Sequence, residues 1–180
     1  SLSSKIGKSC YIPIGHNSKK NIDKNSVLKK LKPLLEDKSV KKIGQNIKFD
    51  FIIFYKHGIE LTSMEDTMLM SYVLDAGRNR HNMDTLSEIH LGHKTIAFKD
   101  LVGSGKKEIN FSDVDIGKAK DYAAEDADIT FRLYKKFKKN LKTEKMTNIY
   151  EVFEKPMIKI LAFMEIEGIK IDSKFLKVLS

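Results

Sequence analysis

The sequence predicts an α/β fold, because short strand patterns occur early in the chain and amphipathic helices surround and follow them. Residues 9–16 and 40–43 have the composition of short strands, and residues 115–139 repeat apolar side chains at helical spacing. The chain has 180 residues, of which 41% are apolar and 32% charged, so it can bury a core. Since only two strand patterns are visible, the expected sheet is thin.

Caps and turn residues delimit the elements in the first part of the chain. Residues 9–16 are expected to form a short strand, with Pro13 at its edge or end. Residues 23–35 are expected to form a helix with one apolar stripe. Residues 40–43 are expected to form a second strand, after which Gly44 turns the chain.

The remaining elements are expected to be helices. The first covers residues 46–57 with Asn46 as its cap, the second residues 65–74, and the third residues 84–91, capped by its first residue. The glycines of residues 101–108 indicate a mobile loop. Two long helices follow, at residues 115–139 and at residues 148–167, and the latter is expected to bend near its proline.

Composition excludes several classes of protein. The longest clear apolar run, Phe51 to Tyr55, is too short to span a membrane. The first residues carry neither a hydrophobic signal segment nor an initiating Met, which is typical of an internal piece of a longer chain. The lone Cys10 excludes an internal disulfide and a multi-cysteine metal site, and favours a reducing, cytoplasmic setting.

Positive charge is concentrated at the start of the chain. Residues 1–50 carry 12 lysines against four acids, which accounts for +8 of the net charge of +9. A basic face beside a nearly neutral body suits a polyanion such as nucleic acid. A compositional bias toward lysine, of the kind that a low-GC genome produces, explains the same charge without any selection for binding.

One carboxylate of the expected helix at residues 115–139 lies on its apolar face. At 100° per residue, Asp126 falls in the middle of a sector that is expected to be buried. That sector consists of Ala119, Tyr122, Ile129, Leu133 and Phe137. Asp121, Glu125 and Asp128 fall together on a different face, which is expected to be solvated. Because burying an ionised carboxylate costs several kcal/mol, Asp126 needs a cation or hydrogen-bond donors, either in a structural bridge or in a functional site.

Asp50 repeats this pattern on the helix at residues 46–57. That helix is apolar over most of its circumference, and Asp50 lies between Ile53 and Phe54 on its surface. Two inward carboxylates without a buried arginine suggest a shared divalent metal, and hard oxygen ligands select Mg²⁺ or Mn²⁺ over Zn²⁺. Tyr122 lies one helical turn before Asp126 on the same face, where its hydroxyl can hold a water beside a metal.

The same residues resemble known motifs. Residues 44–50 (GQNIKFD) and 122–126 (YAAED) resemble the second and third exonuclease motifs of the DEDD superfamily, in its tyrosine-containing branch. Residues 66–72 and 93–95 resemble segments of the proofreading exonuclease domain of bacterial DNA polymerase I. Residues 154–172 are similar to the stretch that leads into the polymerase domain of that family. Ribonuclease D-type exonucleases share the two motifs but are not expected to have this tail.

The resemblance implies a fold and a domain division. It implies the ribonuclease H-like 3′–5′ exonuclease fold, truncated at its first strand, with a C-terminal helix leading into a polymerase domain. Residues 1–147 would be the exonuclease domain and residues 148–180 the start of the polymerase domain. The implied partners are DNA with a single-stranded or frayed 3′ end and the covalently attached polymerase domain, with no membrane involved.

The resemblance also implies roles for individual residues. Two Mg²⁺ or Mn²⁺ ions roughly 4 Å apart would clamp the scissile phosphate. Asp126 would bind the first ion directly, Asp50 would help to hold the second, and Tyr122 would orient the attacking water. Near the substrate, the resemblance places Asn46 at the terminal nucleotide, Arg80 at a backbone phosphate and Phe98 against the terminal bases. An ordinary core anchor is an equally good interpretation of Phe98.

One departure from the family pattern leaves two functions open. The first family motif, an Asp-x-Glu that supplies two of four acids on the first strand, has no counterpart in the sequence. We therefore expect residues 1–180 by themselves to bind metal poorly and to cleave little or no DNA, and their sheet to have an exposed edge. One interpretation is a 3′–5′ exonuclease domain that proofreads for an attached polymerase. The alternative is a non-catalytic domain retained as a scaffold and weak DNA-binding module.

Overall fold

The fold contains two separate two-stranded sheets. The computed structural model describes residues 1–18 and 20–179. Strand β1 (Leu2–Lys5) pairs antiparallel with β2 (Lys8–Cys10), so that Leu2 lies opposite Cys10. Strand β3 (Lys42–Gly44) pairs in parallel with β4 (Met64–Asp66). Within the described residues, no strand joins the two sheets.

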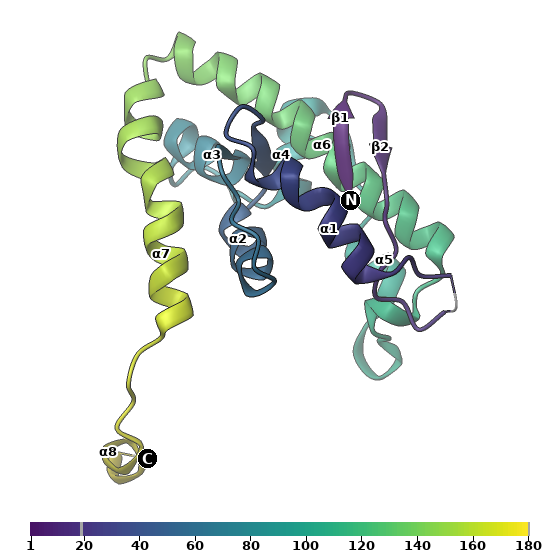
Figure 1. The fold of residues 1–180 in the computed structure, drawn as a ribbon. Coiled ribbons are helices and arrows are strands. Elements are labelled where there is room, and N and C mark those ends of the chain that lie inside the picture. The colour runs from purple at the N-terminus through teal and green to yellow at the C-terminus, as the bar shows by residue number, and fades with distance from the viewer. Residues whose placement is uncertain (19, 180) are drawn as a thin grey trace.

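Helices account for most of the remaining chain (Figure 1). They are α1 (Lys24–Glu36), α2 (Ile47–Lys56), α3 (Thr67–Asp75), α4 (Met83–Leu91), α5 (Phe98–Val102), α6 (Ile116–Thr143), α7 (Lys155–Glu167) and α8 (Ser173–Leu179). Short 3₁₀ turns cover Gly105–Lys107 and Phe111–Asp113, and a π-helical segment, Ile149–Glu154, precedes α7. Within the described part of the chain, no helix is both long and apolar enough to cross a bilayer.

The long helix α6 organises the fold. Its N-terminus is capped by the Asp115 carboxylate, which accepts hydrogen bonds from the backbone N–H groups of Gly117 and Lys118. It contacts α3, α4 and α5 as well as the strands β1, β2 and β3. Both half-sheets therefore rest on the same helix, while α7 packs against α2 and α8 lies apart from the body at the C-terminal end (Figure 1).

Two larger apolar clusters hold these elements together, and α6 supplies the centre of one. That cluster joins α6 to α3, α4 and the π-helical segment through Met70, Leu86, Ile129, Leu133, Phe137, Leu141 and Tyr150. The other joins α2 to α1, β4 and α7 through Leu35, Ile47, Phe51, Ile52, Ile59, Leu61, Met64, Ile158 and Ala162. Each fully buried aliphatic or aromatic side chain contributes about 1.5–3 kcal/mol, so these clusters dominate the stability of the fold.

The sequence expectations hold for the strongly periodic helices and fail for short elements. The helices α1 and α6 begin where they were expected, at Asp23 and Asp115, which serve as N-caps. Strands β1 and β4 were missed, and the expected strand at residues 9–16 overlaps β2 only at its start. The cap position of α4 is occupied by Asn82 rather than Asp84, and the expected loop at residues 101–108 contains helical turns.

A buried ion cluster anchors the π-helical segment to the second sheet. The Glu65 side chain is 2% exposed, and its Oε1 lies 3.2 Å from Lys155 Nζ, 3.6 Å from Lys41 Nζ and 3.7 Å from Lys138 Nζ. Its Oε2 accepts a 3.0 Å hydrogen bond from the hydroxyl of Tyr150, which is fully buried. The negative charge of Glu65 is therefore matched by surrounding donors at the base of α7.

Removing that charge is expected to destabilise the fold. Because Glu65→Gln leaves the three ammonium groups without their shared anion, we expect it to lower the free energy of unfolding by about 3 kcal/mol. Urea denaturation measures this change. The matched control is Glu60→Gln, which breaks an exposed ion pair with Lys159 and is expected to cost less than about 1 kcal/mol. Equal effects of the two substitutions would contradict the role given to Glu65.

Candidate functional site

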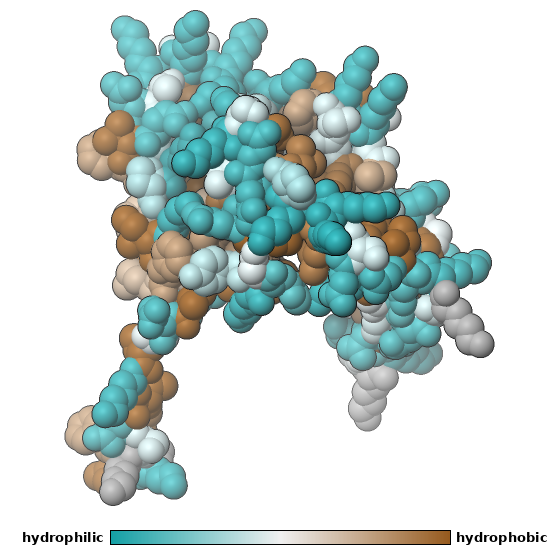
Figure 2. All heavy atoms as spheres, viewed as in Figure 1, coloured by the Kyte–Doolittle hydropathy of each residue, from teal (hydrophilic) through white to brown (hydrophobic). Residues whose placement is uncertain are grey.

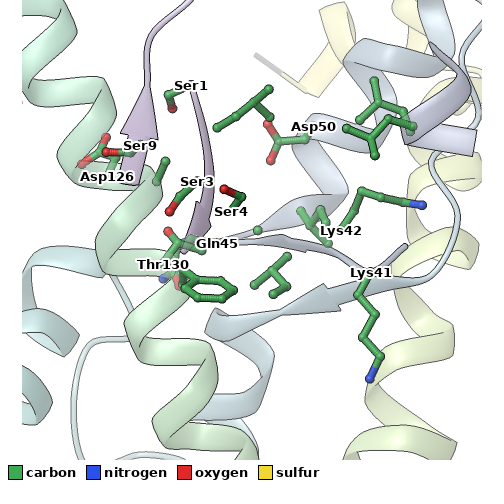
Figure 3. A pocket seen from close by; sticks show the side chains of 18 of the residues that line it. Ser1, Ser3, Ser4, Ser9, Lys41, Lys42, Gln45, Asp50, Asp126 and Thr130 are labelled. Carbon is green, nitrogen blue, oxygen red and sulfur yellow. The ribbon is translucent and has the colours of Figure 1, made fainter. Parts of the chain in front are cut away.

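A cavity of about 1220 Å³ separates the two half-sheets (Figure 3). Residues of β1 line one side of it and residues of β3 line another. The helices α1, α2 and α6 contribute further lining side chains, most of them apolar. The cavity is therefore a slot between two strands, with helices along it.

Asp50 and Asp126 both line this slot. Asp50 projects from α2 and Asp126 from α6, and they lie on opposite sides of the slot with Ser1 between them (Figure 3). Neither carboxylate forms an ion pair with an arginine or lysine among the described residues. The structure thus brings the two sequence-predicted acids to one cavity, each without a lysine or arginine partner among the described residues.

The surroundings of these acids disfavour their charged forms. Asp50 is exposed to the open slot, but partial desolvation still raises its pKa to about 6, and the nearby negative charge of Asp66 adds to the effect. Desolvation likewise raises the pKa of Asp126 to about 6. The Tyr122 hydroxyl works in the opposite direction by hydrogen bonding to Asp126, whereas Asp84 and Glu125 raise the pKa further. A cation placed between the two acids would lower the pKa of each and so favour their charged forms.

One oxygen of Asp126 has no hydrogen-bond partner. The Oδ1 atom is buried and accepts no hydrogen bond from the described residues. Buried polar atoms are nearly always paired, so an orphaned carboxylate oxygen facing a cavity is suited to a cation. The donor set at the slot is carboxylate oxygen, which fits Mg²⁺ or Mn²⁺. However, no group of three or more candidate ligands from His, Cys, Asp or Glu occurs within the described residues.

Three aromatic rings lie together beside Asp126. Tyr122 is half-buried on α6, one turn before Asp126, and its ring centroid lies 5.9 Å from that of Phe98 and 6.3 Å from that of Phe111. Phe98 and Phe111 are stacked with a centroid distance of 6.0 Å. Phe98 is 48% exposed, so it is not an ordinary core anchor. The cluster presents an aromatic surface next to the carboxylate.

The position of Asp50 depends on a buried carboxylate that was not expected at the site. Asp66 is 1% exposed, and its Oδ2 accepts a 2.9 Å hydrogen bond from Ile47 N, while its Oδ1 accepts one of 3.1 Å from Asn46 N. The same Oδ1 accepts a 2.9 Å hydrogen bond from Met68 N at the start of α3. One side chain therefore caps two helices, and burial raises its pKa.

Asn46 is held in a left-handed conformation by this arrangement. Its φ of 59° turns the chain from β3 into α2, and its own side chain makes no capping hydrogen bond. Asn46 is therefore the N-cap residue of α2, as expected, but the Asp66 side chain rather than its own accepts the hydrogen bonds there. The turn is also tight at Gly44, where a Cβ would lie 2.8 Å from Ile47 Cγ1.

Two acids expected on a solvated face of α6 are engaged instead. Asp128 is buried, accepts a 2.6 Å hydrogen bond from the backbone N–H of Gly7 in the β1–β2 turn, and pairs with Arg132. Glu125 is half-buried and accepts hydrogen bonds from the Ile96 backbone N–H and from His93, both at 2.7 Å. The prediction that these two acids lie on a solvated face was wrong, because α6 also contacts the β1–β2 hairpin and the loop after α4.

The other sequence-predicted residues lie around the slot rather than in it. Asn46 is exposed at the start of α2, and Arg80 is exposed in the loop between α3 and α4. Neither of them lines the slot. The helix α2 is also less buried than its composition suggested, since Phe49 is 61% and Ile53 42% exposed.

Comparisons with known proteins identify the family. Residues 1–142 match the model of the 3′–5′ exonuclease family found in DNA polymerases of type A, and the chain belongs to that family. The relatives include DNA polymerase I of Rhizobium leguminosarum, 44% identical over 96% of this chain, and DNA polymerase I of Pseudomonas aeruginosa, 37% identical over all of it. The chain spans 18% and 20% of the length of these two relatives.

Solved structures agree on the fold. Brucella melitensis NrnC matches with a TM-score of 0.61 at 20% identity, covering 78% of this chain and 67% of NrnC. A second structure of the same protein, bound to pGG, matches with a TM-score of 0.60 at 21% identity and covers 87% of this chain and 71% of that one. The expectation of a ribonuclease H-like 3′–5′ exonuclease fold is thereby confirmed.

The double cap predicts a large cost for losing the Asp66 carboxylate. Asp66→Ala removes the acceptor for two helix N-termini, so we expect the free energy of unfolding to fall by about 2–4 kcal/mol, twice the cost of an ordinary cap. Chemical denaturation checks this. Asp115→Ala, which uncaps α6 alone, is the matched control and is expected to cost about 1 kcal/mol. A smaller effect for Asp66→Ala than for the control would contradict the double cap.

The raised pKa of Asp126 predicts a pH-dependent effect of its replacement. An acid whose pKa is 3.8 when unfolded and about 6 when folded stabilises the fold below about pH 4 and loses that contribution as the pH rises through 6. Asp126→Asn should therefore raise the free energy of unfolding at pH 7, by at most about 3 kcal/mol, and have little effect at pH 4. Urea denaturation at both pH values tests this, with the exposed Asp121→Asn as the control.

Proposed function

We propose that this chain forms the 3′–5′ exonuclease domain of a DNA polymerase I and hydrolyses the terminal phosphodiester at the 3′ end of DNA. The observation that carries the proposal is that Asp50 and Asp126 line one cavity and that the Oδ1 atom of Asp126 is buried without a hydrogen-bond partner among the described residues. Membership of the exonuclease family supplies the reaction class. The proposed substrate is DNA with a single-stranded or frayed 3′ end, as the resemblance to proofreading exonucleases implies.

Each candidate residue receives a role in that reaction. Asp50 and Asp126 would hold Mg²⁺ or Mn²⁺, which supplies Lewis acidity and a nucleophilic hydroxide at neutral pH. Tyr122 would orient the attacking water, because its hydroxyl is directed toward Asp126. The position of Phe98 beside Tyr122, half exposed, supports stacking against the terminal base.

Two further residues would contact the substrate from the rim of the slot. Asn46 would lie against the terminal nucleotide, held by the hydrogen bond between its backbone N–H and Asp66. Arg80, exposed before α4, would bind a backbone phosphate. Lysines concentrated in residues 1–50 would add sequence-independent attraction to the DNA.

The division of the chain follows the same proposal. Residues 1–147 would form the exonuclease domain, and residues 148–180 would begin the attached polymerase domain. The helix α6 ends at Thr143, just before this boundary, but Tyr150 and Ile158 beyond it pack into the same apolar clusters as α6 and α2. The π-helical segment and the helices beyond it expose apolar side chains such as Phe153, Met164 and Phe175, and apolar surface gathers along this part of the molecule (Figure 2). Such a surface suits packing against further protein.

A non-catalytic scaffold is the second candidate. The observation that favours it is the small number of ligands, since two carboxylates line the slot and no cluster of three occurs in the described part of the chain. With half of the negative charge of a four-carboxylate site, two divalent ions would be held weakly. We propose accordingly that residues 1–180 by themselves are impaired as a nuclease, whereas a longer protein that supplies further acids is active.

Hydrolysis of 5′-labelled single-stranded DNA distinguishes these functions. In a longer protein that contains this chain, we expect Mg²⁺-dependent shortening from the 3′ end, about 10³-fold slower in Asp126→Ala and about 10- to 100-fold slower in Tyr122→Phe. Asp121→Asn, on the exposed side of α6, should retain the parent rate. Equal rates for all four proteins, or no cleavage by the parent, would favour the scaffold.

The isolated chain provides the complementary test. Residues 1–180 are expected to cleave at least about 100-fold more slowly than the longer protein under the same conditions. Mg²⁺-dependent cleavage by residues 1–180 at the full rate, abolished by Asp126→Ala, would show that two carboxylates are sufficient. It would then contradict the proposed impairment while confirming the site.

A further inference from the structure

The segment between α4 and α5 is tied to α6 by one carboxylate. Glu125 Oε1 lies 2.7 Å from His93 Nε2, and Glu125 Oε2 accepts a 2.7 Å hydrogen bond from the backbone N–H of Ile96. The Glu125 side chain is 19% exposed, so both contacts are partly shielded from water. Hydrogen bonds to a carboxylate are among the stronger ones in proteins, and two of them fix both the distance and the direction of the segment.

The beginning of the same segment is held by α4. The hydroxyl of Ser87 donates a 2.8 Å hydrogen bond to the carbonyl oxygen of His93, and the hydroxyl of Thr95 donates one of 2.6 Å to Asp84 Oδ1. Beyond Thr95, the next hydrogen bond that ties the segment to the rest of the described chain is the one from Ile96 to α6. The end of the segment therefore takes its position from α6 rather than from α4.

Helix α5 depends on outside contacts to hold its first residue, Phe98. It has five residues, its cap residue Ala97 makes no side-chain capping hydrogen bond, and helices of this length are unstable by themselves. Its C-terminal end is fixed because Val102 is buried in an apolar cluster. At the other end, Ile96 lies two residues before Phe98, so the hydrogen bond to Glu125 restrains that end from the α6 side.

The Phe98 ring contacts the candidate site through the turn of α6 that carries Glu125. Its centroid lies 5.9 Å from that of Tyr122, and the ring stacks on Phe111 at 6.0 Å. Tyr122 lies three residues before Glu125, so the two side chains are neighbours on the helix surface. Glu125 thus fixes the Phe98 ring relative to the same helical turn that carries Tyr122 and Asp126.

Both oxygens of Glu125 are occupied, which distinguishes this residue from Asp126. Adjacent residues of a helix are directed about 100° apart, and here Glu125 contacts the segment after α4 while Asp126 lines the slot. Asp126 Oδ1 has no hydrogen-bond partner among the described residues, whereas each Glu125 oxygen has one. Glu125 is therefore suited to hold the protein in place rather than to bind an ion.

We propose that Glu125 is a positioning residue that holds Phe98 where the base of the 3′-terminal nucleotide stacks on it. This inference rests on the proposed function, because the stacking role of Phe98 comes from there. Glu125 itself touches neither DNA nor metal and acts only through Phe98. Stacking of a base on one aromatic ring changes affinity by about 5- to 150-fold, so misplacing the ring should weaken DNA binding about tenfold.

Terminal nucleotides with and without a base test this role in a longer protein that contains this chain. Relative to the parent on the same substrate, Glu125→Ala should lower kcat/KM for Mg²⁺-dependent 3′ hydrolysis about tenfold on an ordinary 3′ end, through a raised KM. When the terminal nucleotide is abasic, the loss should be less than about twofold, because no base stacks on the ring. A general defect of the site would slow both substrates alike. Equal losses on the two substrates would therefore overturn the proposal.

Conservative and control variants distinguish the hydrogen bonds of Glu125 from its negative charge. In Glu125→Gln, the carbonyl oxygen can accept from Ile96 N–H and the amide can donate to His93, so this variant should keep the parent kcat/KM on both substrates. A loss equal to that of Glu125→Ala would show that the charge matters instead, and would contradict the proposal. Asp121→Ala, which removes an exposed acid from the same helix, should behave as the parent does.

Binding without cleavage separates this proposal from the nuclease activity itself. The probe is a single strand that ends in 2-aminopurine, a fluorescent base that stacking quenches, titrated with the longer protein in EDTA. We expect about tenfold weaker binding and less quenching in Glu125→Ala than in the parent, and no further loss when Glu125→Ala is added to Phe98→Ala. If the parent quenches the probe but cleaves no DNA, the proposed function fails while the positioning role is supported. Identical titrations of the parent and Glu125→Ala, or additive losses in the double variant, would overturn the positioning role whatever the rate of cleavage.

Discussion

The hydrogen bonds of the Asp66 carboxylate are the interaction on which the candidate site depends. This side chain, at the last position of β4, holds the first turn of α2 and the first turn of α3 at once. Helix N-termini expose N–H groups that need acceptors, and here one buried anion satisfies both while complementing both helix dipoles. The direction in which Asp50 projects into the slot follows from this junction. The acid that fixes the geometry is therefore distinct from the acids that face the cavity.

The site contains two carboxylates whose negative charges no nearby lysine or arginine balances among the described residues. In Asp50 and Asp126, desolvation acts against the charged form, and the protein supplies no nearby cationic side chain to either among the described residues. The fold maintains this unfavourable arrangement because the apolar clusters on both sides of it contribute most of the stability. Carboxylates that are held desolvated and unpaired, at a cost in folding free energy, are typical of sites that bind ions or charged substrates.

The sequence predicted the features that repeat at a regular period. The stripe of α6 and the position of Asp126 on it follow from 3.6-residue periodicity, and the cap at Asp115 marks the start of the helix. Strands β1 and β4 were missed because strands of three or four residues show too few alternations to be recognised. Periodicity also assigns one buried face per helix, so it misplaced Asp128, which the distant Gly7 contacts. The double cap by Asp66 joins segments separated by some 20 residues, and no local pattern signals it.

Tyr150 connects the end of β4 to the segment that leads into α7. Its hydroxyl accepts a hydrogen bond from the Asp66 backbone N–H at 2.9 Å and donates one to Glu65, so a single buried atom touches both of the consecutive acids. Beyond it, the chain continues without a flexible linker into α7. A displacement of α7 would thus act on the turn at Asn46, because Asp66 is hydrogen-bonded to both Tyr150 and Asn46. The orientation of α7 and the shape of the slot are in this way coupled through Tyr150 and Asp66.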